Sequence, residues 1–276
     1  MVKVSPIRTM GALIGALLAL AIASGWTQDH RNKPEGLSGE PQPKTEKALN
    51  LSDEEWGDLF MARKTYDAAI DRYSLAINSH KDPRPDKTEI ASLYNKVGIC
   101  YQQKMDYGRA RKAYNSAIRL DKNLAQAWNN LGTTYYLDQR AKKSIKYYRR
   151  AIKLDPQVAS FHLNVGTAYF ARKKYQEASN EYRTAIQLDP EVMTRNSTGV
   201  GTAVETRHTD AKYYFYLAKI FASTGNTAEA VRYLEHAMEE GFKDRKRILD
   251  DPDLQKISND PAFVVLMKHP PVAIKD

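Results

Sequence analysis

A step of 34 residues recurs through the middle of the sequence and restricts the chain to a repeated architecture. Gly98, Gly132 and Gly166 are separated by this step. Four more columns keep it: Tyr101, Tyr135 and Tyr169; Tyr114, Tyr148 and Tyr182; Ala117, Ala151 and Ala185; and Ile118, Ile152 and Ile186. A period of this length is typical of stacked supersecondary units, each of which buries its apolar face against its neighbours.

Each unit has the hydrophobic pattern of two helices. Trp128, Leu131 and Tyr135 fall on one helical face, because they are separated by three and four residues. After a short break, Ser144 and Tyr148 begin a second helical face. The glycine of the first helix leaves room where the two helices approach closest, and small residues such as Ser144 serve the same purpose on the second helix. The pattern therefore predicts a series of antiparallel helix pairs.

These residues resemble the tetratricopeptide repeat family, whose pattern is Trp-x2-Leu-Gly-x2-Tyr followed by Ala-x3-Phe, Ala and Pro. The best match, residues 125–156, contains Trp128, Leu131, Gly132, Tyr135, Tyr148, Ala151 and Pro156. The other units are expected at 50–81, 91–122, 159–190 and 211–242, with an insertion at 191–210. The resemblance implies an all-α fold, a right-handed superhelical solenoid of five helix pairs spanning residues 50–242.

The period is lost after residue 242. Asp251-Pro252 and Asp260-Pro261 each predict an N-cap followed by proline in the first helical turn. Terminal repeats leave an apolar end exposed, so we expect residues 243–276 to form a helical cap on the solenoid.

The first 23 residues have the pattern of a signal peptide. Lys3 and Arg8 precede an apolar run over 10–23. Ala21-Ile22-Ala23 offers small residues for cleavage, and Ala23-Ser24-Gly25 is a second candidate. The run is shorter than the roughly 20 residues that span a bilayer. We expect an exported protein, periplasmic in a Gram-negative cell and otherwise secreted; the alternative is an uncleaved N-terminal anchor. Residues 24–49 are polar and contain proline and glycine, which predicts a flexible linker.

The reactive residues do not form a recognisable catalytic or metal-binding pattern. The chain has one cysteine and six histidines, and none of them has a compact metal-ligand spacing. We expect no enzyme activity, no metal and no cofactor. Cys100 is expected to be a small buried hydrophobe, and His162 a core histidine in the column that tryptophan occupies in the family.

The resemblance also implies a concave groove, lined by the first helices, that binds extended protein or peptide segments. The residue two before the glycine points into this groove, and that column reads Glu55, Lys96, Asn130, Asn164 and Tyr216. An amide both donates and accepts, so two asparagines could hold a peptide main chain; the alternative is that both are merely hydrated. The predicted site comprises Asn95, Ile99, Asn130, Thr133, Asn164 and Thr167. Residues after the glycine, Ile99, Thr133 and Thr167, are expected to leave room for the peptide.

Positive charge suggests a second surface. The chain has a net charge of +9, and Lys142, Lys146, Arg149 and Lys153 form one stripe along a predicted second helix. In the family this helix lies on the convex side. The stripe is interpreted either as a solvated face or as a docking site for an anionic surface, such as lipid head groups or an acidic protein. Nucleic acid is disfavoured because the chain is expected to be exported.

Two functions follow from these observations. The first is a non-enzymatic exported scaffold or adaptor that binds protein or peptide segments in the groove. The alternative is a membrane-surface or envelope assembly factor that docks through the basic convex stripe.

Overall fold

The computed structural model describes residues 50–79, 86–193 and 210–274, and the regular elements in these ranges are all α-helices. The predicted signal peptide, the predicted linker and residues 194–209 of the insertion lie outside the described residues. In the same ranges, no helix combines the length and the apolar character needed to cross a membrane.

The helices form consecutive antiparallel pairs. In chain order they are α1 (Asp53–Ala62) with α2 (Tyr66–Ser79), α3 (Lys87–Gln103) with α4 (Tyr107–Leu120), α5 (Ala125–Leu137) with α6 (Ala141–Leu154), α7 (Ala159–Ala171) with α8 (Tyr175–Leu188), and α9 (Ala211–Ser223) with α10 (Thr227–Glu239). The unit predicted at 91–122 begins earlier than expected, because Asp86 accepts a hydrogen bond from the Thr88 N–H and caps α3 ahead of it.

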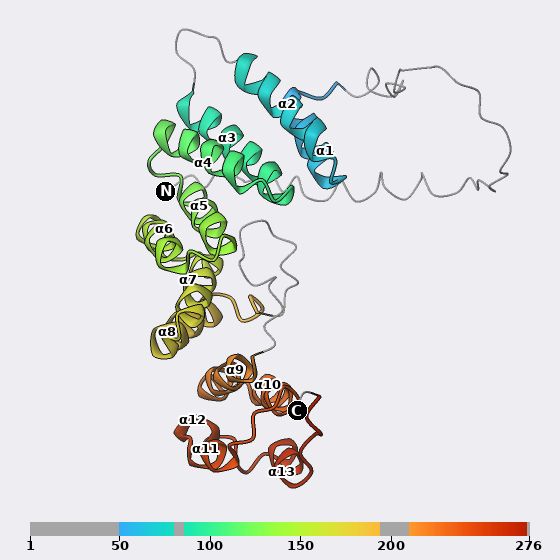
Figure 1. The fold of residues 1–276 in the computed structure, drawn as a ribbon, viewed down its shortest axis with the longest axis vertical. Helices are drawn as coiled ribbons and strands as arrows, with labels where there is room; N and C mark the ends of the chain where they lie inside the picture. The colour runs from blue at the N-terminus through green and yellow to red at the C-terminus, as the bar shows by residue number, and fades with distance from the viewer. Residues whose placement is uncertain (1–49, 80–85, 194–209, 275–276) are drawn as a thin grey trace, which may run out of the picture. The chain divides into compact units, whose positions relative to one another are not determined.

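Each second helix packs against the first helix of the next pair, from α2 on α3 to α8 on α9. Figure 1 shows the pairs following one another in chain order. First helices also touch one another, α3 with α5 and α5 with α7. The α8–α9 contact spans the insertion, and there the Tyr213 ring meets Tyr182 edge-on with centroids 6.0 Å apart. The prediction of an all-α solenoid of tetratricopeptide-type helix pairs is confirmed.

A tyrosine ring lies against the glycine inside each of the first four pairs. A Cβ added to Gly132 would lie 2.8 Å from two ring carbons of Tyr148 and 3.3 Å from the Ser144 carbonyl oxygen. At Gly166 the ring of Tyr182 would be 2.7 Å away. The small residue expected opposite the glycine is present, but the tyrosine ring makes the closer contact. The glycine column is therefore set by the volume of an aromatic ring.

The hydroxyl groups of these tyrosines are paired within their own repeat. Tyr148 donates to Thr133 Oγ1 at 3.2 Å, and Tyr182 donates to Thr167 Oγ1 at 3.3 Å. Tyr114 donates to Gln102 Oε1 at 3.1 Å. A buried hydroxyl without a hydrogen-bond partner would cost free energy. Each repeat that buries such a tyrosine therefore also supplies an acceptor for its hydroxyl group.

Three short helices follow the last pair and form the expected cap. They are α11 (Arg245–Asp250), α12 (Pro252–Gln255) and α13 (Pro261–Lys268). Asp251 and Asp260 accept from the backbone N–H groups that follow them, as their Asp-Pro pattern predicted. Helix α12 packs on α9 and α13 packs on α10, which buries Leu254 and Phe263.

Two further predictions about the core are confirmed. Cys100 is fully buried with its sulfur 3.6 Å from Met61 Sδ, and burial raises the pKa of its thiol to about 12. His162 is also buried, and its Nδ1 lies 2.7 Å from Glu181 Oε2 while its Nε2 lies 3.1 Å from the Pro156 carbonyl oxygen. The hydrogen bond to Glu181 raises the pKa of His162 against the opposing effect of burial.

The raised pKa of His162 predicts a pH-dependent contribution to stability. Because the folded value exceeds the unfolded value of about 6.5, the charged pair stabilises fully below that pH and is lost as the pH rises through the folded pKa. The melting temperature should fall more between pH 6 and pH 9 in the wild type than in His162→Gln or Glu181→Gln. Parallel pH profiles for the wild type and His162→Gln would contradict this assignment.

Candidate protein-binding surface

The asparagines predicted to line the groove are buried in the described structure. Asn130 is 4% exposed and Asn164 is 0% exposed. The alternative interpretation, in which both amides are merely hydrated, is therefore wrong. They lie where the first helices α3, α5 and α7 contact one another, so the neighbouring helices cover them.

The buried amides are hydrogen-bonded to one another across three repeats. Asn130 Nδ2 donates to Asn95 Oδ1 at 3.0 Å, which joins α5 to α3. Asn164 Nδ2 donates to Asn129 Oδ1 at 2.9 Å, which joins α7 to α5. Asn129 Nδ2 donates to Asn130 Oδ1 at 3.3 Å and connects the two bonds. We call Asn95, Asn130, Asn129 and Asn164 the amide chain.

Sequence reasoning missed Asn129, although a signal was present. The partners in both interhelical bonds are 35 residues apart, one more than the repeat. Each bond joins the residue three positions before one repeat's glycine to the residue two positions before the next repeat's glycine. The two partners therefore belong to different columns of the 34-residue repeat. A search for polar pairs at the period plus one would have found Asn129.

Other residues of the same column also connect neighbouring units. Lys96 donates to Glu54 at 2.9 Å and to Asp58 at 2.6 Å, which ties α3 to α1. Burial alone would lower the pKa of Lys96, but these two carboxylates raise it. The Tyr216 ring stacks on Tyr175 with centroids 5.1 Å apart, which ties α9 to α8.

The residues that follow the glycines do not leave the space that was expected. Thr133 and Thr167 are buried, and each accepts the hydroxyl hydrogen bond of its repeat's tyrosine. Thr167 Oγ1 also donates to the Leu163 carbonyl oxygen at 2.9 Å. Ile99 is half-buried and packs against the hydrophobic cluster that α3, α4 and α5 form together. The assignment of these residues and of the asparagines to a peptide site stays a prediction.

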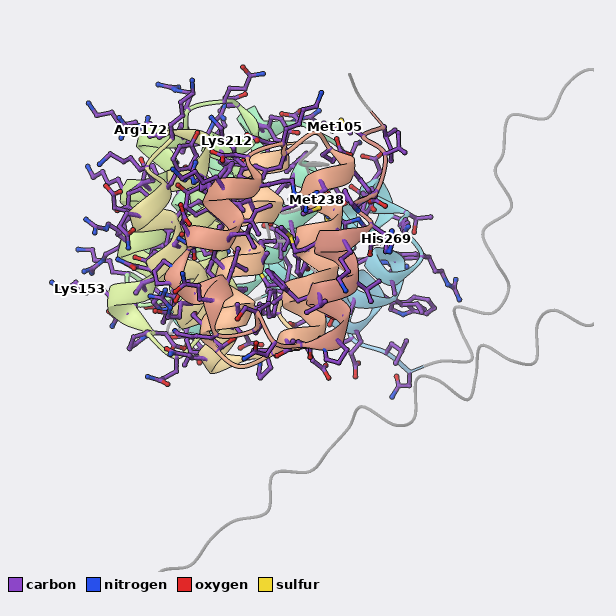
Figure 2. The ribbon with its side chains drawn as sticks, turned by 90° about the horizontal axis from the view of Figure 1, so that it is seen from below. Met105, Lys153, Arg172, Lys212, Met238 and His269 are labelled. Atoms are coloured by element: carbon purple, nitrogen blue, oxygen red, sulfur yellow. The ribbon has the colours of Figure 1, made fainter. Side chains whose placement is uncertain are left out.

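The predicted basic stripe lies on α6 with Lys142, Lys146, Arg149 and Lys153 all exposed. Helix α6 contains no acidic residue. Figure 2 labels Lys153 on this helix and Arg172 beyond the end of α7, and both side chains extend into solvent. Their arrangement suits an anionic partner, because like charges on one exposed face produce a field of a single sign.

Comparison with known families identifies the repeats. Tetratricopeptide repeat models match residues 125–158, 159–192 and 211–240, and a TPR repeat model matches residues 98–139. The uncharacterized protein ycf37 of Guillardia theta is 36% identical over 69 residues, which are 25% of this chain and 38% of that protein. The match thus spans well under half of that relative.

Solved structures with a similar chain path include MamA and YrrB. MamA, whose crystal structure is known, is 21% identical in sequence to this chain. The two structures align with a TM-score of 0.46, over 67% of this chain and 93% of MamA. YrrB, described as a TPR protein with an unusual peptide-binding site, is 17% identical with a TM-score of 0.44, covering 72% of this chain and 89% of that one.

Three matched segments coincide with the pairs α5–α6, α7–α8 and α9–α10, and the fourth runs from Gly98 in α3 through α5. The pairs from α3 to α8 each carry the glycine, the tyrosine and the interhelical contacts described above. The repeats from α3 to α10 therefore belong to the tetratricopeptide repeat family.

Proposed function

We propose that this chain is a non-enzymatic exported scaffold that binds an extended protein segment along its first helices. The observation that carries the proposal is the amide chain, which places hydrogen-bonding groups at consecutive repeat junctions. Packed helices stand about 10 Å apart, and an extended peptide rises about 3.3 Å per residue. One repeat therefore matches about three residues of a bound main chain.

Because the amide chain is buried and hydrogen-bonded internally, a peptide could bind it only by replacing some of these internal hydrogen bonds. An amide bonded to another amide can exchange that partner for a peptide C=O or N–H, so Asn130 and Asn164 would keep their number of hydrogen bonds on binding. The free protein would satisfy its amides internally, and the bound protein would satisfy Asn130 and Asn164 with the ligand. Asn95 and Asn129 would then serve as their partners in the absence of ligand.

A second candidate function is docking to an anionic membrane surface through the basic stripe. It is favoured by the exposure of Lys142, Lys146, Arg149 and Lys153 on a helix without acidic residues. Attraction of this kind between exposed charges is screened by salt, whereas hydrogen bonding in the amide chain is screened much less.

The export part of the proposal rests on the N-terminal sequence and has its own test. Cleavage after Ala23 or Gly25 would give a mature protein beginning at Ser24 or Trp26. N-terminal sequencing of the protein recovered from outside the cytoplasm should find one of these residues. Recovery of a chain that begins at Met1 or Val2 would contradict cleavage.

The peptide-binding proposal predicts different effects for the two halves of the amide chain. Asn130→Ala with Asn164→Ala removes the groups assigned to the ligand, so capture of crosslinked native partners should weaken by roughly 5- to 150-fold, equal to about 0.5–1.5 kcal/mol per hydrogen bond. The matched control, Asn95→Ala with Asn129→Ala, removes the internal partners and should retain capture. Both pairs should lower the melting temperature, because each removes the buried hydrogen bonds that join α3, α5 and α7.

Two outcomes decide between the candidates. Equal loss of capture in the two amide variants, in proportion to their loss of stability, would reject direct binding and leave the amides a structural role. Normal capture by both variants, together with loss of capture when the four residues of the basic stripe are changed to glutamine, would favour the anionic surface.

A further inference from the structure

A basic hollow lies at the turn between α5 and α6, beside the end of α7. It has a volume of about 660 Å³, and five of its eight lining residues are cationic while none is acidic. The cations are Arg140, Lys142, Lys143, Lys146 and Arg172. The volume falls within the range of roughly 300–1,000 Å³ typical of small-molecule sites.

The charge of the hollow is not offset by ion pairs in the described part of the chain. Within residues 50–79, 86–193 and 210–274, no carboxylate forms an ion pair with any of the five. Asp138, which is close in sequence, instead pairs with Arg111 at 2.6 Å. Five like charges around one hollow repel one another, so the arrangement costs free energy unless an anion is bound.

The ring of Tyr135 makes cation–π contacts with two of these cations and with Arg111. Lys143 Nζ lies 4.1 Å from its centroid, and the guanidinium carbons of Arg111 and Arg140 lie 5.1 and 5.4 Å from it. The ring of Tyr147 stacks on Tyr135 with centroids 5.2 Å apart. Aromatic rings thus fix Lys143 and Arg140, which reduces the conformational entropy that a ligand would have to remove.

The N-terminus of α6 lies in the lining of the same hollow. Arg140 is the N-cap residue and makes no side-chain capping hydrogen bond, while Lys142 and Lys143 lie in the first turn. At the corresponding turns, Asp106 caps α4 and Asn226 caps α10, whereas Lys174 leaves α8 without a side-chain cap as well. Cations at a helix N-terminus oppose the helix dipole, whereas an anion there is stabilised by the dipole and by the unpaired N–H groups.

We propose that this hollow binds a phosphate group. A phosphate dianion would accept hydrogen bonds from the guanidinium groups of Arg140 and Arg172, while the lysines supply compact positive charge. The hollow shares Lys142 and Lys146 with the basic stripe but excludes Arg149 and Lys153, and it lies apart from the amide chain. The site therefore goes beyond the proposed scaffold function. The phosphate belongs either to a soluble molecule or to a lipid head group.

The first experiment measures binding of pyrophosphate to the full mature protein by calorimetry. The test variant is Arg140→Gln with Arg172→Gln, and the matched control is Arg149→Gln with Lys153→Gln, which removes the same charge from exposed positions outside the hollow. The test variant should bind about tenfold more weakly or worse, and the control should change less than about twofold. No binding by the wild type, or equal weakening of both variants, would overturn the site. Circular dichroism verifies that both variants remain folded.

The second experiment identifies the source of the phosphate. Phosphatidylcholine vesicles containing phosphatidate are compared in sedimentation with vesicles containing an equal charge of phosphatidylserine. Preferential retention on phosphatidate that pyrophosphate displaces, and that the test variant loses, supports a lipid head group. Pyrophosphate binding without retention supports a soluble phosphate. Equal retention on both vesicle types by the wild type and both variants would show non-specific charge and overturn the proposal for lipid.

Discussion

The contact on which the array depends is a tyrosine ring packed against a glycine inside a helix pair. Gly132 and Tyr148 represent it, and an added Cβ would lie 2.8 Å from the ring carbons. Real Cβ atoms do not approach carbon so closely, so a side chain at the glycine would force the two helices apart. Fully burying a large apolar side chain contributes roughly 1.5–3 kcal/mol. The ring in this position stabilises its pair, and the pairs can then stack.

The fifth pair shows that volume decides the residues in this contact. Ala218 occupies the glycine column of α9 and Leu234 occupies the tyrosine column of α10, and both are fully buried. Alanine in place of glycine adds a methyl group, and leucine in place of tyrosine leaves room for it. Volume-conserving exchanges of this kind are the ones that packed cores tolerate best. This contact can therefore be formed by glycine with tyrosine or by alanine with leucine, and in each case the two residues must match in volume.

Polar contacts between first helices join the pairs. The amide chain joins α3, α5 and α7, while Lys96 ties α3 to α1 through two carboxylates. Polar groups buried at these junctions favour one register, because any other would leave them unpaired. The column two residues before the glycine thus holds neighbouring repeats of this chain together.

The repeat pattern within each unit was enough to predict the fold. The candidate site could be predicted only in part, because it depends on which residues of different units lie side by side. The 34-residue columns indicated the helix pairs, the glycine contact and the burial of Cys100 and His162, because these depend on periods within one unit. The pairing of Asn129 with Asn164 depends on how adjacent units are offset. The basic hollow requires Arg172, from the end of α7, to lie beside Arg140 at the start of α6. Neither arrangement follows from the spacing of residues within a repeat.

A double-mutant cycle at the central contact tests the account most directly. The free energy of unfolding is measured in urea for the wild type, Gly132→Ala, Tyr148→Leu and the double variant, with Gly108→Ala as the control at a helical glycine whose added Cβ would meet its nearest atom at 3.5 Å. Gly132→Ala should cost about 1–3 kcal/mol alone. In the Tyr148→Leu background, as in the control, the change should be neutral or stabilising by up to about 1 kcal/mol. An equal cost for Gly132→Ala in both backgrounds would show that the tyrosine ring does not determine the glycine and would contradict the account.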